Sequence, residues 1–421
     1  MHILFLSHYF PPEVNAPASR TFDHCKTWVK QGHQVTVVTC APNHPRGKVY
    51  DGYKNRLYSS EEIDGIRVVR LWTYITANEG FVKRTLGYVS YMLATFFYLP
   101  FAPRADVVIS TSPQFFNGLA GYAYKLLKRT PWVLEIRDLW PESILAVGAI
   151  KNKKIIGLLE WLERFAYRKA DHIVPVTDAF RDYMLNLGVP AEKITVIKNG
   201  VDLSLYDDSS EADLSVLPDE VAALQGRFVA AYVGTHGMAH HLETILEAAE
   251  LLRDEPGIVF LTVGEGAESA RLRALRDEKG LDNVIMAGQL PKTAMPAIWA
   301  ISDVSLVLLK DLPLFRTVIP SKIFESMAMG KPIILGVRGE SQQIVESAGA
   351  GFAITPQSAD ELAEKLRLLY NDKDSYQRLA GSGRGFVQTH YDRSTLAQRL
   401  LSAIEGLVAR GRTKRRSDSA L

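Results

Sequence analysis

Short apolar runs alternate with amphipathic helical patterns along this chain, and the alternation occurs in two successive series. The first series opens with an apolar run at 3–7, a helical pattern at 19–30 and an apolar run at 35–39, which is the order of a βαβ unit. Further strand candidates lie at 107–110, 132–136, 172–176 and 194–197. This alternation predicts a parallel, doubly wound α/β sheet that binds its ligand at the carboxyl ends of the strands.

The alternation restarts after a polar interval, which predicts a second domain. Residues 207–224 are acidic and Ser-containing, without a clear apolar face, as is typical of a connection between domains. Beyond it, a helical pattern covers 242–252, and strand candidates lie at 228–233, 259–263, 284–287, 304–308 and 332–335. We therefore divide the chain into a first domain at 1–205, a connection at 206–226, a second domain at 227–400, and a C-terminal helix end with a basic tail at 401–421.

The composition narrows the possible functions. The 49 Lys and Arg residues nearly balance the 47 Asp and Glu residues, giving a net charge of +2, so no nucleic acid partner is expected. Cys25 and Cys40 lie in the first apolar region and are expected to be buried thiols in a reducing compartment. The N-terminus has neither a basic region nor a small-residue cleavage site, so we expect no signal peptide and a cytoplasmic location.

An uncharged, aromatic-rich stretch at 86–101 is flanked by Lys83, Arg84 and Arg104. It is shorter than the roughly 20 apolar residues that a transmembrane helix needs, and it contains Pro100. Two interpretations remain open: the stretch is buried in the core, or it lies in a membrane interface. The second gains weight if the protein acts on a lipid-linked molecule.

Three loops follow predicted strands and carry small or polar residues, at 9–17, 234–237 and 320–325. Backbone N–H groups at such positions can face an anionic ligand. Each loop taken alone can equally serve only to reverse the chain direction.

Together with other motifs, these loops resemble glycosyltransferase family 4, the retaining enzymes of the GT-B fold. The resemblance spans nearly the whole chain and rests on SHYFPPE, GHQVTVVT, KITVIKNGVD at 193–202, YVGTHG, VGEG at 263–266 and PSKIFESMAMGKPII at 320–334. Within the family, EIRDLWPES at 135–143 together with PSKIFE resembles bacterial enzymes of O-antigen and capsule assembly, including those that transfer N-acetylfucosamine.

The resemblance implies two Rossmann-like domains that face each other across a cleft, the first binding an acceptor and the second a nucleotide sugar. It implies retaining transfer of a sugar, with an N-acetylated deoxyhexosamine on UDP as the best analogy. The expected acceptor is a glycan or an undecaprenyl-diphosphate sugar used in surface polysaccharide synthesis. The protein would then be peripheral on the cytoplasmic face of the inner membrane, and neither a metal nor another cofactor is expected.

The family pattern also assigns donor-binding residues, with departures. Glu325 is expected to bind the donor ribose, and the helix beginning near Ser321 is expected to face the diphosphate. The first glutamate of the family's two-glutamate motif is here Thr317, and the usual Arg and Lys after the YVG strand are replaced by Thr235 and His240. The other expected donor-binding residues, which include substitute cations and hydrogen-bonding groups, are Arg316, Lys322, Gly234, His236 and Asn15.

On the acceptor side, the family often has a His where this chain has Arg137 and Asp138. We expect Asp138 to orient or deprotonate the acceptor hydroxyl, with Arg137 beside it and Glu142 as a second candidate base or a ligand of a sugar hydroxyl. The structural alternative is an ion pair between Arg137 and Asp138 at a strand end. Two further functions stay open: a transferase-like binding protein without turnover, and a sugar-nucleotide epimerase of the same fold.

Overall fold

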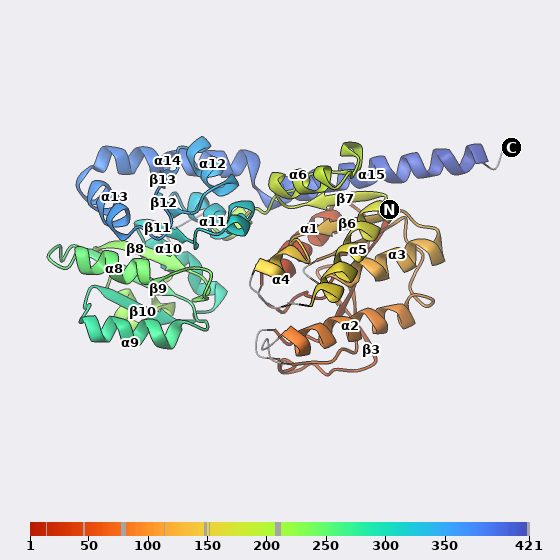
Figure 1. Cartoon of the computed structure of the whole chain (residues 1–421), viewed down its shortest axis with the longest axis horizontal. Coiled ribbons are helices and arrows are strands. Elements are labelled where there is room, and N and C mark those ends of the chain that lie inside the picture. The colour runs from red at the N-terminus through yellow and green to blue at the C-terminus, as the bar shows by residue number, and fades with distance from the viewer. Residues whose placement is uncertain are drawn as a thin grey trace. The chain divides into compact units, whose positions relative to one another are not determined.

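The computed structural model describes residues 1–13, 15–44, 47–76, 81–112, 114–146, 150, 152–206 and 212–418. The chain forms two compact units. The first comprises Met1–Asn199 together with Arg393–Leu421, and the second comprises Gly200–Asp392 (Figure 1). Each unit is an α/β structure with its own sheet, as the two series of apolar runs predict.

The first unit contains a seven-stranded sheet of order β3-β4-β2-β1-β5-β6-β7. Its strands are β1 (His2–Leu6), β2 (Gln34–Cys40), β3 (Tyr58–Ile63), β4 (Ile66–Leu71), β5 (Val107–Thr111), β6 (Trp132–Ile136) and β7 (His172–Pro175). Neighbouring strands pair in parallel, except β3, which forms an antiparallel hairpin with β4. The strand order reverses at β1, which pairs with both β2 and β5, and such a switch point is where doubly wound sheets bind ligands.

Helices cover both faces of this sheet. One core layer contains side chains of α1 (Ala16–Lys30) and α15 (Arg393–Asp418), and the other contains side chains of α2, α3, α5 and α6. The helices on that second side, together with the short α4, are α2 (Phe81–Tyr98), α3 (Asn117–Lys128), α4 (Glu142–Ala146), α5 (Lys153–Lys169) and α6 (Asp178–Asn186). Cys25 and Cys40 are free and buried, which confirms the expectation of buried thiols.

The second unit contains a six-stranded, wholly parallel sheet of order β10-β9-β8-β11-β12-β13. Its strands are β8 (Phe228–Val233), β9 (Ile258–Val263), β10 (Val284–Gly288), β11 (Val304–Leu308), β12 (Ile333–Gly336) and β13 (Gly351–Ala353). Its helices are α7 (Asp219–Ala222), α8 (Glu243–Leu251), α9 (Ser269–Lys279), α10 (Met295–Ile301), α11 (Lys322–Ala328), α12 (Glu340–Ser347), α13 (Ala359–Asn371) and α14 (Lys373–His390). Separate core layers on the two faces contain α10, α11 and α12 on one side and α8, α9 and α13 on the other.

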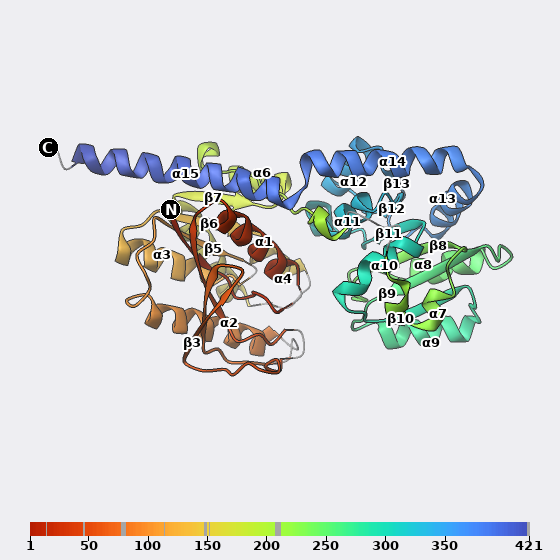
Figure 2. The ribbon, with the colours of Figure 1, turned by 180° about the vertical axis from the view of Figure 1, so that it is seen from behind.

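The C-terminal helix corrects the predicted domain boundaries. Residues 393–400 were assigned to the second domain, but α15 packs on α1 in the first unit, as Figure 2 shows. The Trp28 indole donates to the Ala397 carbonyl at 2.9 Å, and Leu400 is buried beneath the helix. An apolar helical stripe does not indicate which sheet it covers, so the sequence pattern alone could not place it. The basic tail lies outside the residues whose side chains are described.

The predicted connection at 206–226 is also different in the structure. Tyr206, Leu217, Val221 and Leu224 are buried in the core of the second unit, and only 207–211 lie outside the described residues. These apolar residues are irregularly spaced within a polar segment, so the hydrophobic periodicity of the sequence does not reveal that they pack in a core. The segment therefore belongs to the second unit, and the chain crosses between units at 199–200 and 392–393.

Other elements differ locally from the prediction. Residues 194–197 form no regular strand, although they run beside β7 with an isolated bridge between Ile194 and Ile173 and backbone hydrogen bonds from Thr195 and Ile197 to the carbonyls of Ile173 and Pro175. The β3–β4 hairpin and β13 were not predicted. Residues 86–98 of the uncharged stretch belong to α2, which buries Tyr91 and Tyr98 but exposes Leu93 and Phe97. Among the described residues, no helix has the length and apolarity required to cross a bilayer.

We predict that Leu400→Ala destabilises the first unit by about 2–5 kcal/mol, because it leaves a cavity between α15 and the sheet. The measurement is urea unfolding followed by tryptophan fluorescence, and the control is Arg399→Ala on the exposed side of the same helix. Equal stability of the two variants would contradict the packing of α15 on this unit.

Candidate functional site

The turn after β8 lies against the turn after β9 at the carboxyl edge of the second sheet. Gly234 donates its N–H to the Val263 carbonyl at 2.8 Å and has a positive φ of 148°. A Cβ added to Gly264 would come within 1.9 Å of the Gly234 carbonyl oxygen, and one added to Gly266 within 2.4 Å of the His236 carbonyl oxygen. The two turns therefore touch through their backbones, and glycine is required for this close approach.

Lys322, the first residue of α11, brings a cation to the same turn. Its Nζ lies 3.6 Å from the centroid of the Tyr232 ring, and a Cβ added to Gly234 would come within 2.8 Å of it. This Nζ is buried and has no hydrogen-bond partner among the described residues. Burial lowers the pKa of Lys322 to about 7, although the Glu325 carboxylate opposes the shift. The ammonium therefore has a π-face nearby but lacks the hydrogen bonds that a buried cation normally requires.

Two histidines, His236 and His240, lie near the Tyr232 ring, each with its ring centroid 6.0 Å from that of Tyr232. The His236 Nδ1 is 3.2 Å from the Ser269 hydroxyl, and its Nε2 is buried without a partner in the described part of the chain. Burial lowers the pKa of both histidines, and Lys322 adds to the effect, bringing His240 to about 4. Neutral, hydrogen-bonding imidazoles are therefore favoured here in the absence of a bound anion.

The remaining donor-side candidates are placed differently. Glu325 lies one helical turn after Lys322 on α11, on the same side of the helix. Ser321 occupies the N-cap position of α11, and its side chain makes no capping hydrogen bond. Arg316 is half-exposed and forms an ion pair with Asp311 at 3.0 Å. Its neighbour Thr317 donates its hydroxyl to the Leu314 carbonyl at 2.7 Å, so the position of the first family glutamate holds a local turn together.

The structure thus brings Gly234, Thr235, His236, His240 and Lys322 together around Tyr232. The Tyr232 hydroxyl donates to the Thr235 carbonyl at 2.9 Å, which fixes the ring beneath this turn. Asn15, by contrast, belongs to the first unit, where its Oδ1 accepts the Ala18 N–H at 2.8 Å and caps α1. The sequence analysis assigned no role to Tyr232, although its place in the YVGTHG motif, two residues before Gly234, was a usable signal.

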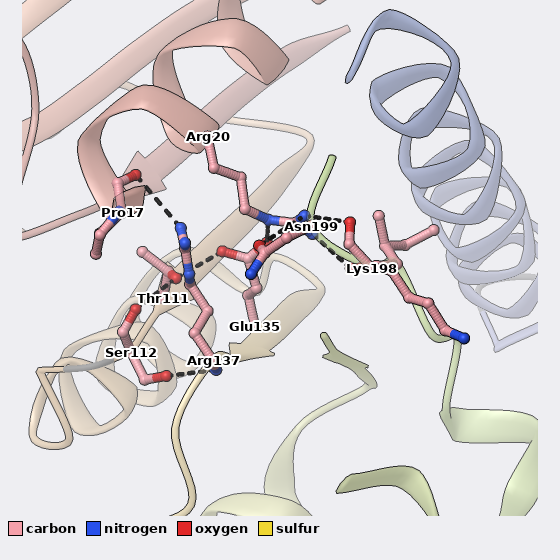
Figure 3. A network of polar contacts seen from close by, with 9 residues as sticks. Pro17, Arg20, Thr111, Ser112, Glu135, Arg137, Lys198 and Asn199 are labelled. Atoms are coloured by element: carbon pink, nitrogen blue, oxygen red, sulfur yellow. Dashed lines mark hydrogen bonds and ion pairs between the residues drawn. The ribbon is translucent and has the colours of Figure 1, made fainter. Parts of the chain in front are cut away.

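A buried polar network occupies the carboxyl end of β6 in the first unit (Figure 3). Arg20 of α1 forms an ion pair with Glu135 at 3.0 Å and donates to the carbonyls of Ile197 and Lys198. The Thr111 hydroxyl donates to the second Glu135 oxygen at 2.6 Å. Burial alone would raise the pKa of Glu135, but Arg20, Arg137 and this hydroxyl hold it below its usual value.

Arg137 lies next to this network, and its guanidinium extends toward Pro17 (Figure 3). Its backbone N–H donates to the Ser112 hydroxyl at 2.6 Å, and its Nη1 donates to the Pro17 carbonyl at 3.4 Å. Burial lowers the pKa of Arg137 to about 9; Glu135 opposes the shift and Arg20 adds to it. The prediction missed Arg20 and Glu135, although an arginine on the apolar side of a predicted helix was the available signal.

Asp138 and Glu142 lie in the loop that follows β6 and in the helix α4. Asp138 accepts hydrogen bonds from the Trp140 indole and the Ser143 hydroxyl, both at 3.2 Å, so its carboxylate is oriented by its own loop. Glu142 accepts a hydrogen bond from the Tyr183 hydroxyl, which also contacts Glu163 at 3.2 Å. Burial, with the charge of Glu142, raises the pKa of Glu163 to about 8. Glu142 is therefore part of a pair of carboxyl groups joined by Tyr183, of which Glu163 is buried.

No group of three or more His, Cys, Asp or Glu side chains is arranged to hold a metal ion within the ranges that the structure describes.

Comparison with known families matches both units. Residues 15–200 match the model of a glycosyl transferase 4-like domain, and residues 217–386 match that of glycosyl transferases group 1. The chain is 26% identical over 375 residues to the putative colanic acid biosynthesis glycosyl transferase WcaI of Escherichia coli, covering 87% of this chain and 91% of that protein. It is 28% identical over 324 residues to the probable glycosyltransferase WbjE of Pseudomonas aeruginosa, covering 73% and 76%.

Solved structures give the same fold. The sucrose-phosphate synthase of Thermosynechococcus elongatus superposes with a TM-score of 0.75 at 18% identity, covering 97% of this chain and 99% of that one. Anabaena HepE in complex with UDP-glucose superposes with a TM-score of 0.71 at 19% identity, covering 96% and 100%. The fold and the two family matches define this protein as a glycosyltransferase of the GT-B fold. More specifically, the chain belongs to glycosyltransferase family 4, which confirms the family prediction.

We predict that the stability of the first unit falls as the pH rises from about 5 to 8, because of Glu163. Its pKa rises from 4.5 to about 8 on folding, so within this window the folded protein retains a proton that the unfolded chain has released. Glu163→Gln should flatten this dependence, measured as the urea midpoint at several pH values. Glu160→Gln on the same helix is the control, and an unchanged slope in Glu163→Gln would contradict the assignment.

Proposed function

We propose that this protein transfers a sugar, with retention of configuration, from a nucleotide-diphosphate donor in the synthesis of a bacterial surface polysaccharide. The donor is UDP-linked and carries an N-acetylated deoxyhexosamine such as N-acetylfucosamine. The acceptor is a glycan or an undecaprenyl-diphosphate sugar at the cytoplasmic face of the inner membrane. Relatives named for colanic acid synthesis and a structural neighbour solved with UDP-glucose support this proposal.

The observation that carries the proposal is the buried Lys322 ammonium at the glycine turn after β8. It has no hydrogen-bond partner among the described residues, and a diphosphate provides the acceptor oxygens that it lacks. Thr235 and His240 stand where family members have cations, so Lys322 takes over their role. Glu325, one turn further along α11, binds the ribose hydroxyls. Ser321, His236 and His240 contribute hydrogen bonds to the donor, and no metal or other cofactor takes part.

During transfer, negative charge accumulates on the departing nucleoside diphosphate. A preorganised cation and N–H groups at that point stabilise the transition state more than the ground state. Since the pKa of free Lys322 is about 7, binding of a diphosphate shifts it to the charged form and takes up a proton near neutral pH.

On the acceptor side, Asp138 orients or deprotonates the attacking hydroxyl. Its two hydrogen bonds from Trp140 and Ser143 orient the Asp138 carboxylate, and a carboxylate is a suitable group to accept the proton of the acceptor hydroxyl. Arg137 supplies positive charge beside it, and Glu142, held by Tyr183, supports the loop or binds a sugar hydroxyl.

We predict that Lys322→Met weakens UDP binding roughly 10- to 100-fold, the usual loss for a charge-assisted hydrogen bond. Arg316→Ala should have a smaller effect, because Arg316 is half-exposed and already paired with Asp311. Isothermal titration calorimetry with UDP measures both variants. If Lys322→Met bound UDP as tightly as the wild type does, the proposed role of Lys322 in diphosphate binding would be wrong.

We predict that Asp138→Asn lowers turnover by about 10²- to 10⁴-fold while UDP affinity stays the same, because the amide cannot accept the proton. Product formation is followed by mass spectrometry with a panel of nucleotide sugars and a lipid-diphosphate sugar acceptor. Ser143→Ala, which removes one of the two hydrogen bonds to Asp138, should lower turnover less. Normal turnover in Asp138→Asn would exclude this role, and donor binding by the wild type without product would favour a binding protein.

A further inference from the structure

An apolar groove of about 750 Å³ runs along α2 in the first unit. One wall is the β3–β4 hairpin with its flanking residues, and the other is the outer side of α2. The groove is lined by Leu57, Tyr58, Arg67, Leu71, Trp72, Ser90, Leu93, Ala94, Phe97, Tyr98 and Phe101. Its volume lies in the range of pockets that bury small-molecule ligands, about 300–1,000 Å³.

The groove is bordered by large apolar side chains that the fold leaves uncovered. Leu57, Phe97 and Phe101 are 83%, 78% and 82% exposed. Leu93 and Phe97 lie one turn apart on α2, on the side opposite the buried Tyr91. The helix therefore has two apolar sides, and only one of them packs in the core of the first unit. Contiguous exposed apolar surface of this kind marks an interaction site.

The site lies at the open edge of the sheet. β3 is the terminal strand of the order β3-β4-β2-β1-β5-β6-β7, and Figures 1 and 2 both show α2 beside β3, away from α15. Two of the residues of α2 that line the groove, Ser90 and Ala94, have small side chains, which leaves room between the hairpin and the helix. The groove is therefore concave and can enclose one hydrocarbon chain, whereas a flat surface could only adsorb to a membrane.

Positive charge accompanies the groove. Arg67 lines it and is exposed, Lys83 is exposed in the first turn of α2, and Arg104 is exposed just beyond the helix. Glu62 pairs with Arg67 in the hairpin register and offsets part of this charge. An apolar groove with an exposed arginine in its wall is complementary to an amphiphile that has a hydrocarbon chain and an anionic head.

We propose that this groove binds the hydrocarbon chain of a lipid phosphate, with the phosphate held at Arg67. The proposal rests on the proposed function and deepens it, since it assigns the lipid part of a lipid-linked acceptor to a site on this chain. The chain lies over Leu71 and Ala94, and the aromatic side chains of Trp72, Phe97 and Phe101 border it at the level of the lipid headgroups.

Equilibrium dialysis of the purified protein against farnesyl phosphate, butyl phosphate and inorganic phosphate tests the site. Farnesyl phosphate should bind at least tenfold more tightly than the other two. Ala94→Trp fills the groove while leaving the bordering residues intact, and it should weaken farnesyl phosphate binding at least tenfold. Leu126→Trp, which adds the same side chain at an exposed position of α3, is the matched control and should bind normally. Leu93→Gln provides a second groove variant if Ala94→Trp does not fold.

Three results would overturn the proposal. The first is normal farnesyl phosphate binding by both groove variants. The second is adsorption to phosphatidylglycerol vesicles that depends on Phe97 but not on Ala94, which would indicate a membrane contact without a chain site. The third is a dimer in sedimentation equilibrium that Phe97→Ser dissociates, without lipid binding by the wild type, which would indicate a second copy as the occupant.

The proposed function is tested separately, because the dialysis contains no nucleotide sugar. Transfer to a soluble acceptor that lacks a lipid chain should persist in Ala94→Trp. If the wild type did not bind farnesyl phosphate but still transferred the sugar to the soluble acceptor, only the inference about the groove would be wrong. Farnesyl phosphate binding without transfer by the wild type would instead remove the proposed function.

Discussion

The ion pair between Arg20 and Glu135 joins three parts of the first unit that are distant in sequence. It links helix α1 to the end of β6, and the remaining N–H groups of Arg20 hold the carbonyls of residues 197 and 198, just before the chain leaves this unit. Both partners are buried, so the loss of either would leave an uncompensated charge at a cost of about 3–5 kcal/mol. The position of Arg137 and of the Asp138 loop beyond it depends on this arrangement.

The buried cation of the second unit, Lys322, differs from Arg20 because it has no hydrogen-bond partner among the described residues. Lys322 has the face of Tyr232 beside it and no hydrogen-bond acceptor among the described residues, whereas the network around Glu135 is satisfied by side chains and carbonyls. A satisfied pair stabilises one arrangement of the fold. An unsatisfied cation next to close-packed glycine turns is costly to keep without an anion, and such a cost is typical of a site that a ligand completes.

The sequence predicted much of this architecture correctly. Apolar runs such as those at 132–136 and 228–233 match β6 and β8, because strands buried on both sides carry few polar residues. The hairpin at 58–71 escaped prediction since β3 lies at the sheet edge and its exposed positions carry Ser and Glu. On the candidate site, the PSKIFE residues and the turn residues 234–237 were found from family resemblance, whereas the role of Arg20 and the contact of Lys322 with the Tyr232 ring came only from the structure.

The sequence by itself determined the fold class, the family and the local elements that carry the motifs, because periodicity and motif spacing depend on residues close together in the chain. Only the tertiary structure decided that α15 returns to the first sheet, that Glu142 and Glu163 share Tyr183, and that one side of α2 stays uncovered. These features arise from contacts between distant segments. An apolar stripe on a helix, or a single charged residue in an apolar segment, indicates that the side chains need a packing or ion-pair partner. Which residues provide that partner depends on how the whole unit packs.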